Sequence, residues 1–269
     1  MYEKELNAER LIKDFDAALS EKQFKVYYQA KYLVQGERPV LASAEALVRW
    51  FHPELGFISP GAFIPLFEEN GLVQSLDHYV WDEAASQIRK WKDRYGITVP
   101  ISVNVSRIDI YNPNLERNLL RIVNREGLTP GELLLEVTES AYTDDSKQII
   151  QVVESLRKNG FKIEMDDFGS GYSSLNMLTE LPLDALKLDM AFIRNMTASK
   201  KNMKMVELMM DIAQFLEVPV IAEGVETEEQ FSLLKRVGCD IIQGYYFSKP
   251  IPAEEFEAIH LVSARTGEQ

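Results

Sequence analysis

Acidic, amide and basic side chains recur at the ends of short apolar segments along this chain. These segments are predicted to be β-strands, because they are rich in branched and aromatic residues and are bounded by polar turns. The side chains in question are Glu45, Arg49, Asn104, Glu136, Glu139, Asp166, Asp167, Lys187, Glu223 and Gln243. Taken singly, each has an ordinary structural interpretation, such as a turn, a helix cap or a surface ion pair. Their recurrence on consecutive strands favours one shared site.

The residue types in this set indicate a site for hard cations. Carboxylate and amide oxygens favour Mg²⁺ or Mn²⁺ over Zn²⁺. Asp166 could bridge two such ions about 3.5–4 Å apart, the spacing of two-metal phosphoryl chemistry. Lys187 could orient a water molecule or neutralise charge in the transition state, and the planar fork of Arg49 suits a phosphate. The pattern therefore predicts metal-assisted hydrolysis of a phosphate ester.

Composition and charge agree with this interpretation. The chain has 269 residues, with 29 Lys and Arg against 42 Asp and Glu, and a formal net charge of −13. Such an acidic chain is not expected to bind DNA or RNA polymers, and it needs cations to accept a phosphodiester. The single cysteine, Cys239, excludes an intrachain disulfide and a cysteine-based zinc site, and it fits a cytoplasmic protein. No apolar run reaches 18 residues, so membrane insertion is not expected.

Eight predicted strands must position these side chains, and helical patterns alternate with them. The strands are Phe24–Leu33, Pro39–Arg49, Val99–Asn104, Leu133–Val137, Lys162–Asp166, Ala185–Leu188, Pro219–Ala222 and Ile241–Gln243. This alternation predicts an α/β fold of the (β/α)8 type, in which chemistry gathers at the C-terminal ends of the strands. Only residues 34–38 separate the first two strands, which is too short for a helix, so these two should be antiparallel. The prediction is a modified TIM barrel with an antiparallel first strand.

Helices are predicted where apolar residues recur at a spacing of three to four, and a glycine follows several of them. The ranges are Asp77–Tyr95, Leu115–Glu126, Ser146–Lys158, Lys201–Leu216 and Glu228–Val237. A further amphipathic helix at the N-terminus is predicted to cap the barrel or to link it to another domain. The predicted organisation is thus a linker or capping helix over residues 1–22, a barrel over 23–262 and a tail over 263–269. The three histidines, His52, His78 and His260, are expected at the surface or with satisfied hydrogen bonds, away from the site.

Eight sequence blocks, in a fixed order, carry a resemblance to a known family. They are SAEALVRW, GFISPGAFIP, SVNVS, LLLEVTES, MDDFGSGYSSL, LKLD, VIAEGVET and QGYYFSKP. Together they resemble the EAL family of bacterial cyclic di-GMP phosphodiesterases, over roughly Phe24–Pro250. The resemblance implies metal-dependent hydrolysis of one phosphodiester bond of cyclic di-GMP to linear pGpG, by a water activated by two Mg²⁺ or Mn²⁺ ions. It also implies a homodimer, and a sensor or cyclase domain that is fused or acts as a partner.

The resemblance assigns roles to individual residues. It implies that Glu45, Asn104, Glu136 and Asp166 bind a first metal, and that Asp166, Asp167 and Glu223 bind a second. Lys187 matches the lysine that contacts the nucleophilic water, and Glu223 also has a base-like role. Substrate contacts are implied for Gln29, Leu47, Arg49, Gln243 and Glu226. Support of the DDFG loop is implied for Glu139 and Ser170, and we expect this loop to couple dimerisation to activity.

Some residues depart from the family pattern, and other functions are compatible with parts of the sequence. Ser170 replaces the usual threonine and keeps its hydroxyl, whereas Glu164 replaces a usual small residue for no reason visible in the sequence. A catalytically inactive receptor for cyclic di-GMP is one alternative, although all the implied metal ligands and Lys187 are present. A barrel glycosidase would use Glu136 and Glu223, but it would leave Asp166, Asp167 and Lys187 unexplained. A purely structural barrel would leave the clustered carboxylates unexplained.

Overall fold

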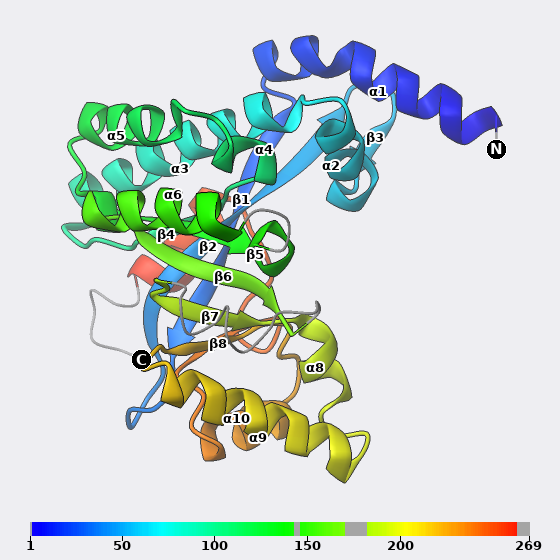
Figure 1. Cartoon of the computed structure of the whole chain (residues 1–269). Coiled ribbons are helices and arrows are strands. Elements are labelled where there is room, and N and C mark those ends of the chain that lie inside the picture. Colours follow the sequence, from blue (N-terminus) through cyan, green and yellow to red (C-terminus); the bar gives the residue numbers. More distant parts are fainter. Residues whose placement is uncertain (1, 143–145, 170–181, 263–269) are drawn as a thin grey trace.

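The structure is a computed structural model that describes residues 2–142, 146–169 and 182–262, with side chains described for residues 8–142, 147–169 and 182–262. Eight strands close into a barrel, and one short strand is added to its edge (Figure 1). The strands are β1 Phe24–Leu33, β2 Val40–His52, β3 Gly56–Ile58, β4 Ile101–Asn104, β5 Leu133–Thr138, β6 Lys162–Phe168, β7 Ala185–Leu188, β8 Val220–Ala222 and β9 Ile241–Gln243.

The topology confirms the predicted modified barrel. β1 pairs antiparallel with both β2 and β9, whereas β2 and β4 to β9 pair parallel around the remainder of the ring. All eight predicted barrel strands are present, with ends shifted by up to three residues. The sequence prediction missed β3, which is three residues long and forms a hairpin with the extended end of β2.

The helices lie on the outside of the barrel (Figure 1). They are α1 Tyr2–Ser20, α2 Pro60–Glu69, α3 Val73–Tyr95, α4 Arg107–Ile110, α5 Leu115–Arg125, α6 Ser146–Lys158, α8 Met190–Asn195, α9 Lys200–Phe215, α10 Glu228–Arg236 and α11 Ala253–Phe256. All five predicted internal helices are confirmed, whereas the short helices α2, α4, α8 and α11 were not predicted. At the N-terminus, α1 packs on the barrel through Leu11, Phe15 and Ala18, all of which are buried.

Helix α3 shows how an amphipathic sequence positions the site. Trp81, Ala84, Ile88 and Trp91 are fully buried, at the spacing that places them on one face of a helix. The indole nitrogen of Trp81 donates to the backbone oxygen of Asn104 at 2.9 Å. Packing of α3 therefore fixes the C-terminal end of β4, where a predicted metal ligand lies.

The C-terminal anchor is the segment Glu257–Leu261, a π-helical turn that follows α11. Its Glu257 carboxylate accepts hydrogen bonds from four side chains of α3, which are Gln87, Trp91, Arg94 and Tyr95. Beside it, Nδ1 of the buried His260 lies 2.7 Å from the hydroxyl of Tyr32. The anchor thus ties the end of the barrel domain to α3 and β1.

The histidines only partly follow the sequence prediction. Nδ1 of His52 accepts the backbone N–H groups of Glu54 and Leu55, and its Nε2 lies 3.1 Å from Asp14. By contrast, the Nε2 atoms of His78 and His260 are buried without a hydrogen-bond partner among the described residues. The expectation that every histidine would be exposed or satisfied was therefore wrong.

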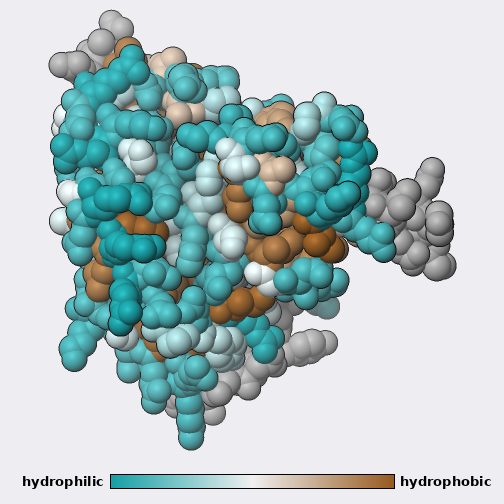
Figure 2. Space-filling view, turned by 90° about the horizontal axis from the view of Figure 1, so that it is seen from above, coloured by the Kyte–Doolittle hydropathy of each residue, from teal (hydrophilic) through white to brown (hydrophobic). Residues whose placement is uncertain are grey.

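Within the described ranges, none of the helices has the length and apolar character needed to cross a membrane. Seen from above the view of Figure 1, the surface is mostly hydrophilic, with hydrophobic side chains gathered in a few patches (Figure 2).

Candidate functional site

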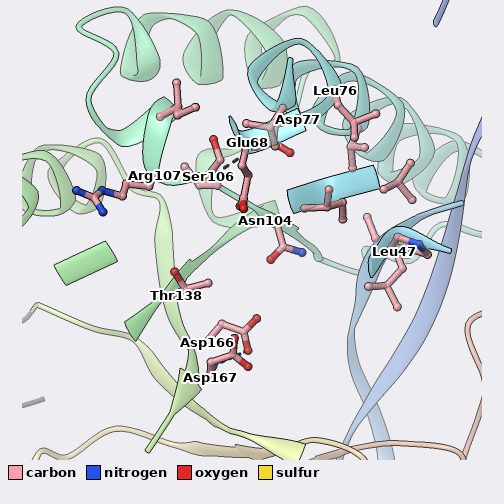
Figure 3. Close-up of a pocket in the computed structure, with 18 of the residues that line it drawn as sticks. Leu47, Glu68, Leu76, Asp77, Asn104, Ser106, Arg107, Thr138, Asp166 and Asp167 are labelled. Atoms are coloured by element: carbon pink, nitrogen blue, oxygen red, sulfur yellow. Dashed lines mark hydrogen bonds between the residues drawn. The ribbon is translucent and has the colours of Figure 1, made fainter. Parts of the chain in front are cut away.

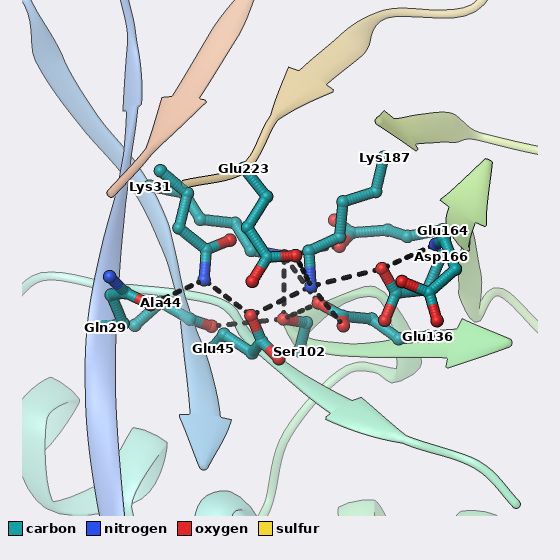
Figure 4. Close-up of polar contacts among 12 residues, drawn as sticks. Gln29, Lys31, Ala44, Glu45, Ser102, Glu136, Glu164, Asp166, Lys187 and Glu223 are labelled. Atoms are coloured by element: carbon teal, nitrogen blue, oxygen red, sulfur yellow. Dashed lines mark hydrogen bonds and ion pairs between the residues drawn. The ribbon is translucent and has the colours of Figure 1, made fainter. Parts of the chain in front are cut away.

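The period of two along each strand places the polar side chains inside the barrel. Gln29 on β1 pairs with Glu45 on β2, and Asn104 on β4 pairs with Glu136 on β5. We use the name rim cluster for the residues that meet at this level. They are Gln29, Glu45, Glu136, Asp166, Lys187, Glu223 and Gln243 (Figure 4).

Lys187 on β7 is the centre of the rim cluster. Its Nζ lies 3.0 Å from Glu45 and 3.0 Å from Glu136, 3.4 Å from Asp166 and 3.3 Å from Glu223. The side chain is 1% exposed, so these four carboxylates are the environment that replaces water around the ammonium. The prediction that strand ends bring these residues together is confirmed for this group.

Two glutamines close one side of the rim cluster. Nε2 of Gln243 donates to Glu45 at 2.5 Å and to Gln29 at 3.0 Å, and Gln29 in turn donates to the backbone oxygen of Ser248. Gln243 is fully buried, yet its Oε1 has no hydrogen-bond partner among the described residues. Buried polar atoms are normally paired, and this oxygen is an exception.

Asp166 and Asp167 lie on an irregular stretch of β6. The pairing of β6 with β7 shifts between Met165 and Phe168, and Asp167 has a φ of 57°. Asp is among the residues that tolerate this left-handed conformation. A bulge turns successive side chains away from the regular alternation, so both carboxylates can face the mouth of the barrel.

A cavity of about 540 Å³ lies beside the rim cluster (Figure 3). Five of the predicted site residues line it, namely Leu47, Arg49, Asn104, Asp166 and Asp167. Glu68, Asp77, Ser106, Arg107 and Thr138 also contribute to its wall. The sequence prediction did not name these five as site residues. Four of them lie on helices or at a helix start, whose approach to the strands depends on tertiary packing, and Thr138 is the last residue of β5. The cavity provides space for a ligand next to the acidic end of the barrel.

A second buried lysine lies one layer below the rim cluster and was missed by the sequence prediction. Nζ of Lys31 contacts Ser102 at 2.8 Å, Glu136 at 2.7 Å and Glu164 at 2.5 Å (Figure 4). We call Lys31, Ser102 and Glu164 the floor cluster. A sequence signal existed, because each of these residues stands two positions from a predicted site residue on the same strand. Ser102 precedes Asn104 by two, Glu164 precedes Asp166 by two, and Lys31 follows Gln29 by two. Alternation along a strand therefore places all of them on the inner face.

The charges of the two clusters shift several pKa values in the metal-free protein. Burial raises the pKa of Asp166 to about 6; Lys187 opposes the shift and Glu136 adds to it. Burial likewise raises the pKa values of Glu45 and Glu223. Burial alone would also raise the pKa of Glu136, but Lys187 and Lys31 outweigh it and hold the pKa below its ordinary value. The Glu136 carboxylate is thus held ionised, while burial and neighbouring carboxylates raise the pKa values of the groups around it.

The donor chemistry of the rim cluster fits divalent hard cations. The rim and floor clusters together with Asp167 hold six carboxylates, those of Glu45, Glu136, Glu164, Asp166, Asp167 and Glu223. Five of them pair with Lys31 or Lys187, and the whole group has four excess negative charges when all are ionised. Oxygen ligands with excess negative charge suit Mg²⁺ or Mn²⁺. Within the described residues, however, no three acidic, histidine or cysteine side chains already have the arrangement of a metal site. Bound cations would therefore have to draw carboxylates away from Lys187.

The remaining predicted residues lie at different distances from this centre. Oε2 of Glu139 accepts the backbone N–H of Gly169 at 2.8 Å and so supports the end of β6. Glu226 is exposed, and its carboxylate lies 3.8 Å from Arg194 of α8, so the structure does not bring it into the rim cluster. Ser170 lies outside the described residues.

Comparison with known proteins places this site in a family. Cyclic di-GMP phosphodiesterase PdeR of Escherichia coli is 35% identical over 89% of this chain. The bifunctional diguanylate cyclase/cyclic di-GMP phosphodiesterase MucR of Pseudomonas aeruginosa is 37% identical over 93% of this chain. The chain spans only 36% of the length of each of these two relatives.

The fold comparison agrees. A structure described as the phosphodiesterase of PaMucR in complex with c-di-GMP superposes with a TM-score of 0.87 and 37% identity, over 92% of this chain and 99% of that one. The sequence matches the EAL domain over residues 12–250. The chain therefore belongs to the EAL domain family.

Proposed function

We propose that this chain hydrolyses one phosphodiester bond of cyclic di-GMP and releases linear pGpG. The observation that carries the proposal is the rim cluster, in which one buried lysine is surrounded by four carboxylates beside a cavity. Relatives named as cyclic di-GMP phosphodiesterases support the choice of substrate.

Two divalent cations, Mg²⁺ or Mn²⁺, complete the proposed site. Glu45, Asn104, Glu136 and Asp166 would hold the first, and Asp166, Asp167 and Glu223 the second. When bound, such ions neutralise phosphate charge and lower the pKa of a water molecule. The two clusters together with Asp167 carry an excess of four negative charges when all carboxylates are ionised, which supports this stoichiometry, because two divalent ions would cancel it.

The protein's own side chains would orient the reactants. With its carboxylate partners engaged elsewhere, the ammonium of Lys187 would donate to the attacking water and hold it in line with the phosphorus. Glu223, whose pKa is raised by burial, would accept a proton from that water. The guanidinium of Arg49 on the cavity wall would pair with a phosphate oxygen.

Substrate placement follows from the walls of the same cavity. Leu47 and Arg49 line it, and Gln29 and Gln243 belong to the rim cluster beside it. We keep Gln243 as a substrate contact because its buried Oε1 is available to accept a hydrogen bond. Glu226 would need to leave Arg194 to take part, so its contribution should be the smallest of the proposed contacts.

We also propose that the chain works as a cytoplasmic homodimer and is attached to, or partnered by, a sensor or cyclase domain. Relatives such as MucR and the oxygen sensor protein DosP of Escherichia coli are about three times longer than the part this chain matches. The dimer is tested by light scattering during size-exclusion chromatography, and a monomeric mass at micromolar concentration would argue against it.

The test of activity is chromatography of cyclic di-GMP after incubation with the purified protein. We expect linear pGpG with Mg²⁺ or Mn²⁺, none with EDTA, and none with the Lys187→Ala variant. A nucleotide that binds with metal but stays intact would instead identify a receptor. Hydrolysis that continues in EDTA would contradict the metal-dependent mechanism.

A further inference from the structure

The floor cluster holds an ammonium group whose hydrogen-bonding capacity is fully used. Lys31 has three N–H donors, and its Nζ lies 2.8 Å from Ser102, 2.7 Å from Glu136 and 2.5 Å from Glu164. The Lys31 side chain is completely buried. It therefore has one fixed position, set by three different strands.

The two oxygens of Glu136 face different layers of the barrel. Oε1 accepts bonds from Lys31 at 2.7 Å and from Ser102 at 2.6 Å, both in the lower layer. Oε2 meets only Lys187 of the rim cluster, at 3.0 Å. Rotation of the carboxylate would break both bonds at Oε1 in a fully buried position, which is costly unless new partners replace them. Only Oε2 is therefore presented to a ligand at the rim.

Glu164 explains how a second lysine can lie under a cation site without opposing it. An unpaired ammonium below the rim cluster would repel any divalent cation bound there. Nζ of Lys31 contacts Glu164 at 2.5 Å, and the Glu164 side chain is 8% exposed. The negative charge of Glu164 offsets the positive charge of Lys31. The floor cluster can therefore orient Glu136 without reducing the attraction of the site for cations.

We propose that Lys31, with its charge balanced by Glu164, is a positioning residue that fixes Glu136 as a ligand through Oε2. The proposal rests on the proposed function, because it assigns Glu136 to a metal. Hydrogen-bonded groups behind a metal ligand typically account for roughly 10–100-fold in metal affinity. We expect an effect of that size here.

The test is titration of the metal-free protein with Mn²⁺, with free Mn²⁺ measured by electron paramagnetic resonance. Three proteins are compared, namely wild type, Lys31→Met and the double variant Lys31→Met/Glu164→Leu. Lys31→Met leaves Glu164 without a partner and should both destabilise the protein and weaken Mn²⁺ binding. The double variant removes the whole ion pair, so its melting temperature should recover to within a few degrees of wild type. We expect its Mn²⁺ affinity to stay at least ~10-fold below that of wild type.

A control separates positioning from general destabilisation. Glu257→Gln weakens the C-terminal anchor, where the Glu257 carboxylate bonds to side chains of α3 and not to the floor cluster, and it should leave Mn²⁺ affinity unchanged. If Lys31→Met fails to fold, the double variant still decides the question. A double variant that binds Mn²⁺ as tightly as wild type would overturn the proposal, as would a wild-type protein that binds no Mn²⁺.

The Mn²⁺ titration needs no turnover, so failure of the proposed function is distinguishable from failure of this inference. A wild-type protein that binds Mn²⁺ but leaves cyclic di-GMP intact would refute the proposed hydrolase activity. The Mn²⁺ affinities of the Lys31 variants could still be compared with that of wild type. In an active protein, the double variant should need more Mn²⁺ for half-maximal activity. Its kcat at saturating Mn²⁺ should fall less than its activity at limiting Mn²⁺.

Discussion

At the C-terminal anchor one carboxylate meets four donors, whereas at the rim cluster one ammonium serves four carboxylates. Glu257 accepts bonds at 2.6–3.4 Å from Gln87, Trp91, Arg94 and Tyr95. Lys187 lies 3.0–3.4 Å from its four partners, which also repel one another. Both regions bury charge, but only the anchor satisfies it.

This difference separates residues that stabilise the fold from residues that serve the site. A buried carboxylate with enough donors contributes to stability, and removing it leaves those donors without partners. A cluster with more carboxylates than cations costs stability until a ligand supplies positive charge. Replacement of an acid by its amide should therefore act in opposite directions in the two regions.

The largest effect is expected from Asp166→Asn in the rim cluster. The change removes a proposed bridging ligand, so hydrolysis of cyclic di-GMP should fall more than ~100-fold, beyond the loss typical of residues that only support a ligand. The metal-free variant should nevertheless melt a few degrees higher, as about 1 kcal/mol of relieved repulsion would give in a chain of this size. Parallel activity and calorimetry measurements test this. A variant that is both inactive and less stable without metal would contradict the claim that repulsion among the rim carboxylates destabilises the metal-free protein.

The opposite pattern is expected from Glu257→Gln in the C-terminal anchor. An amide keeps the shape but loses the charge-assisted bond to Arg94 and cannot accept from all four donors. Unfolding by urea should show a loss of about 2 kcal/mol. At 25 °C the folded variant should hydrolyse cyclic di-GMP within about twofold of wild type. A large loss of activity without a loss of stability would show that the anchor acts on the site.

Much of the fold could be predicted because strand and helix patterns repeat regularly in this sequence. The antiparallel first strand followed from the shortness of residues 34–38, and the structure confirms it. Strand β3 and helix α2 were missed because three and ten residues give little periodicity of their own. Their stability comes from tertiary contacts, which include the buried Phe63 and Phe67.

The candidate site could be predicted best where its side chains stand at or near the ends of strands, and less well elsewhere. Glu136, Asp166, Lys187 and Glu223 stand at or near those ends, Glu45 stands inside the long strand β2, and all five converge. Lys31 and Glu164 stand inside strands, where only the alternation of faces could have shown that they meet across the barrel.

The direction of the Glu226 side chain also could not be predicted from the sequence. Glu226 follows the end of β8 closely, but its carboxylate is near Arg194 rather than the rim cluster. Its direction depends on how the chain turns after Ala222, and there a Cβ on Gly244 would come within 2.1 Å of the backbone oxygen of Val225. Such close backbone approach is a tertiary feature that residue spacing does not encode.

The smallest effect is expected from His260 and concerns pH. Burial lowers the pKa of His260 from its ordinary 6.5 to about 4. The unfolded chain therefore binds a proton between these values and the folded protein does not, so stability is complete above pH 6.5 and falls as the pH drops towards 4. About 1 kcal/mol should be lost by pH 5.5. His260→Gln keeps an acceptor for the Tyr32 hydroxyl and removes the titration, so the difference between wild-type and variant unfolding curves isolates this group from the rim carboxylates. A difference that stays constant from pH 7.5 to 5 would show that the anchor does not hold His260 neutral.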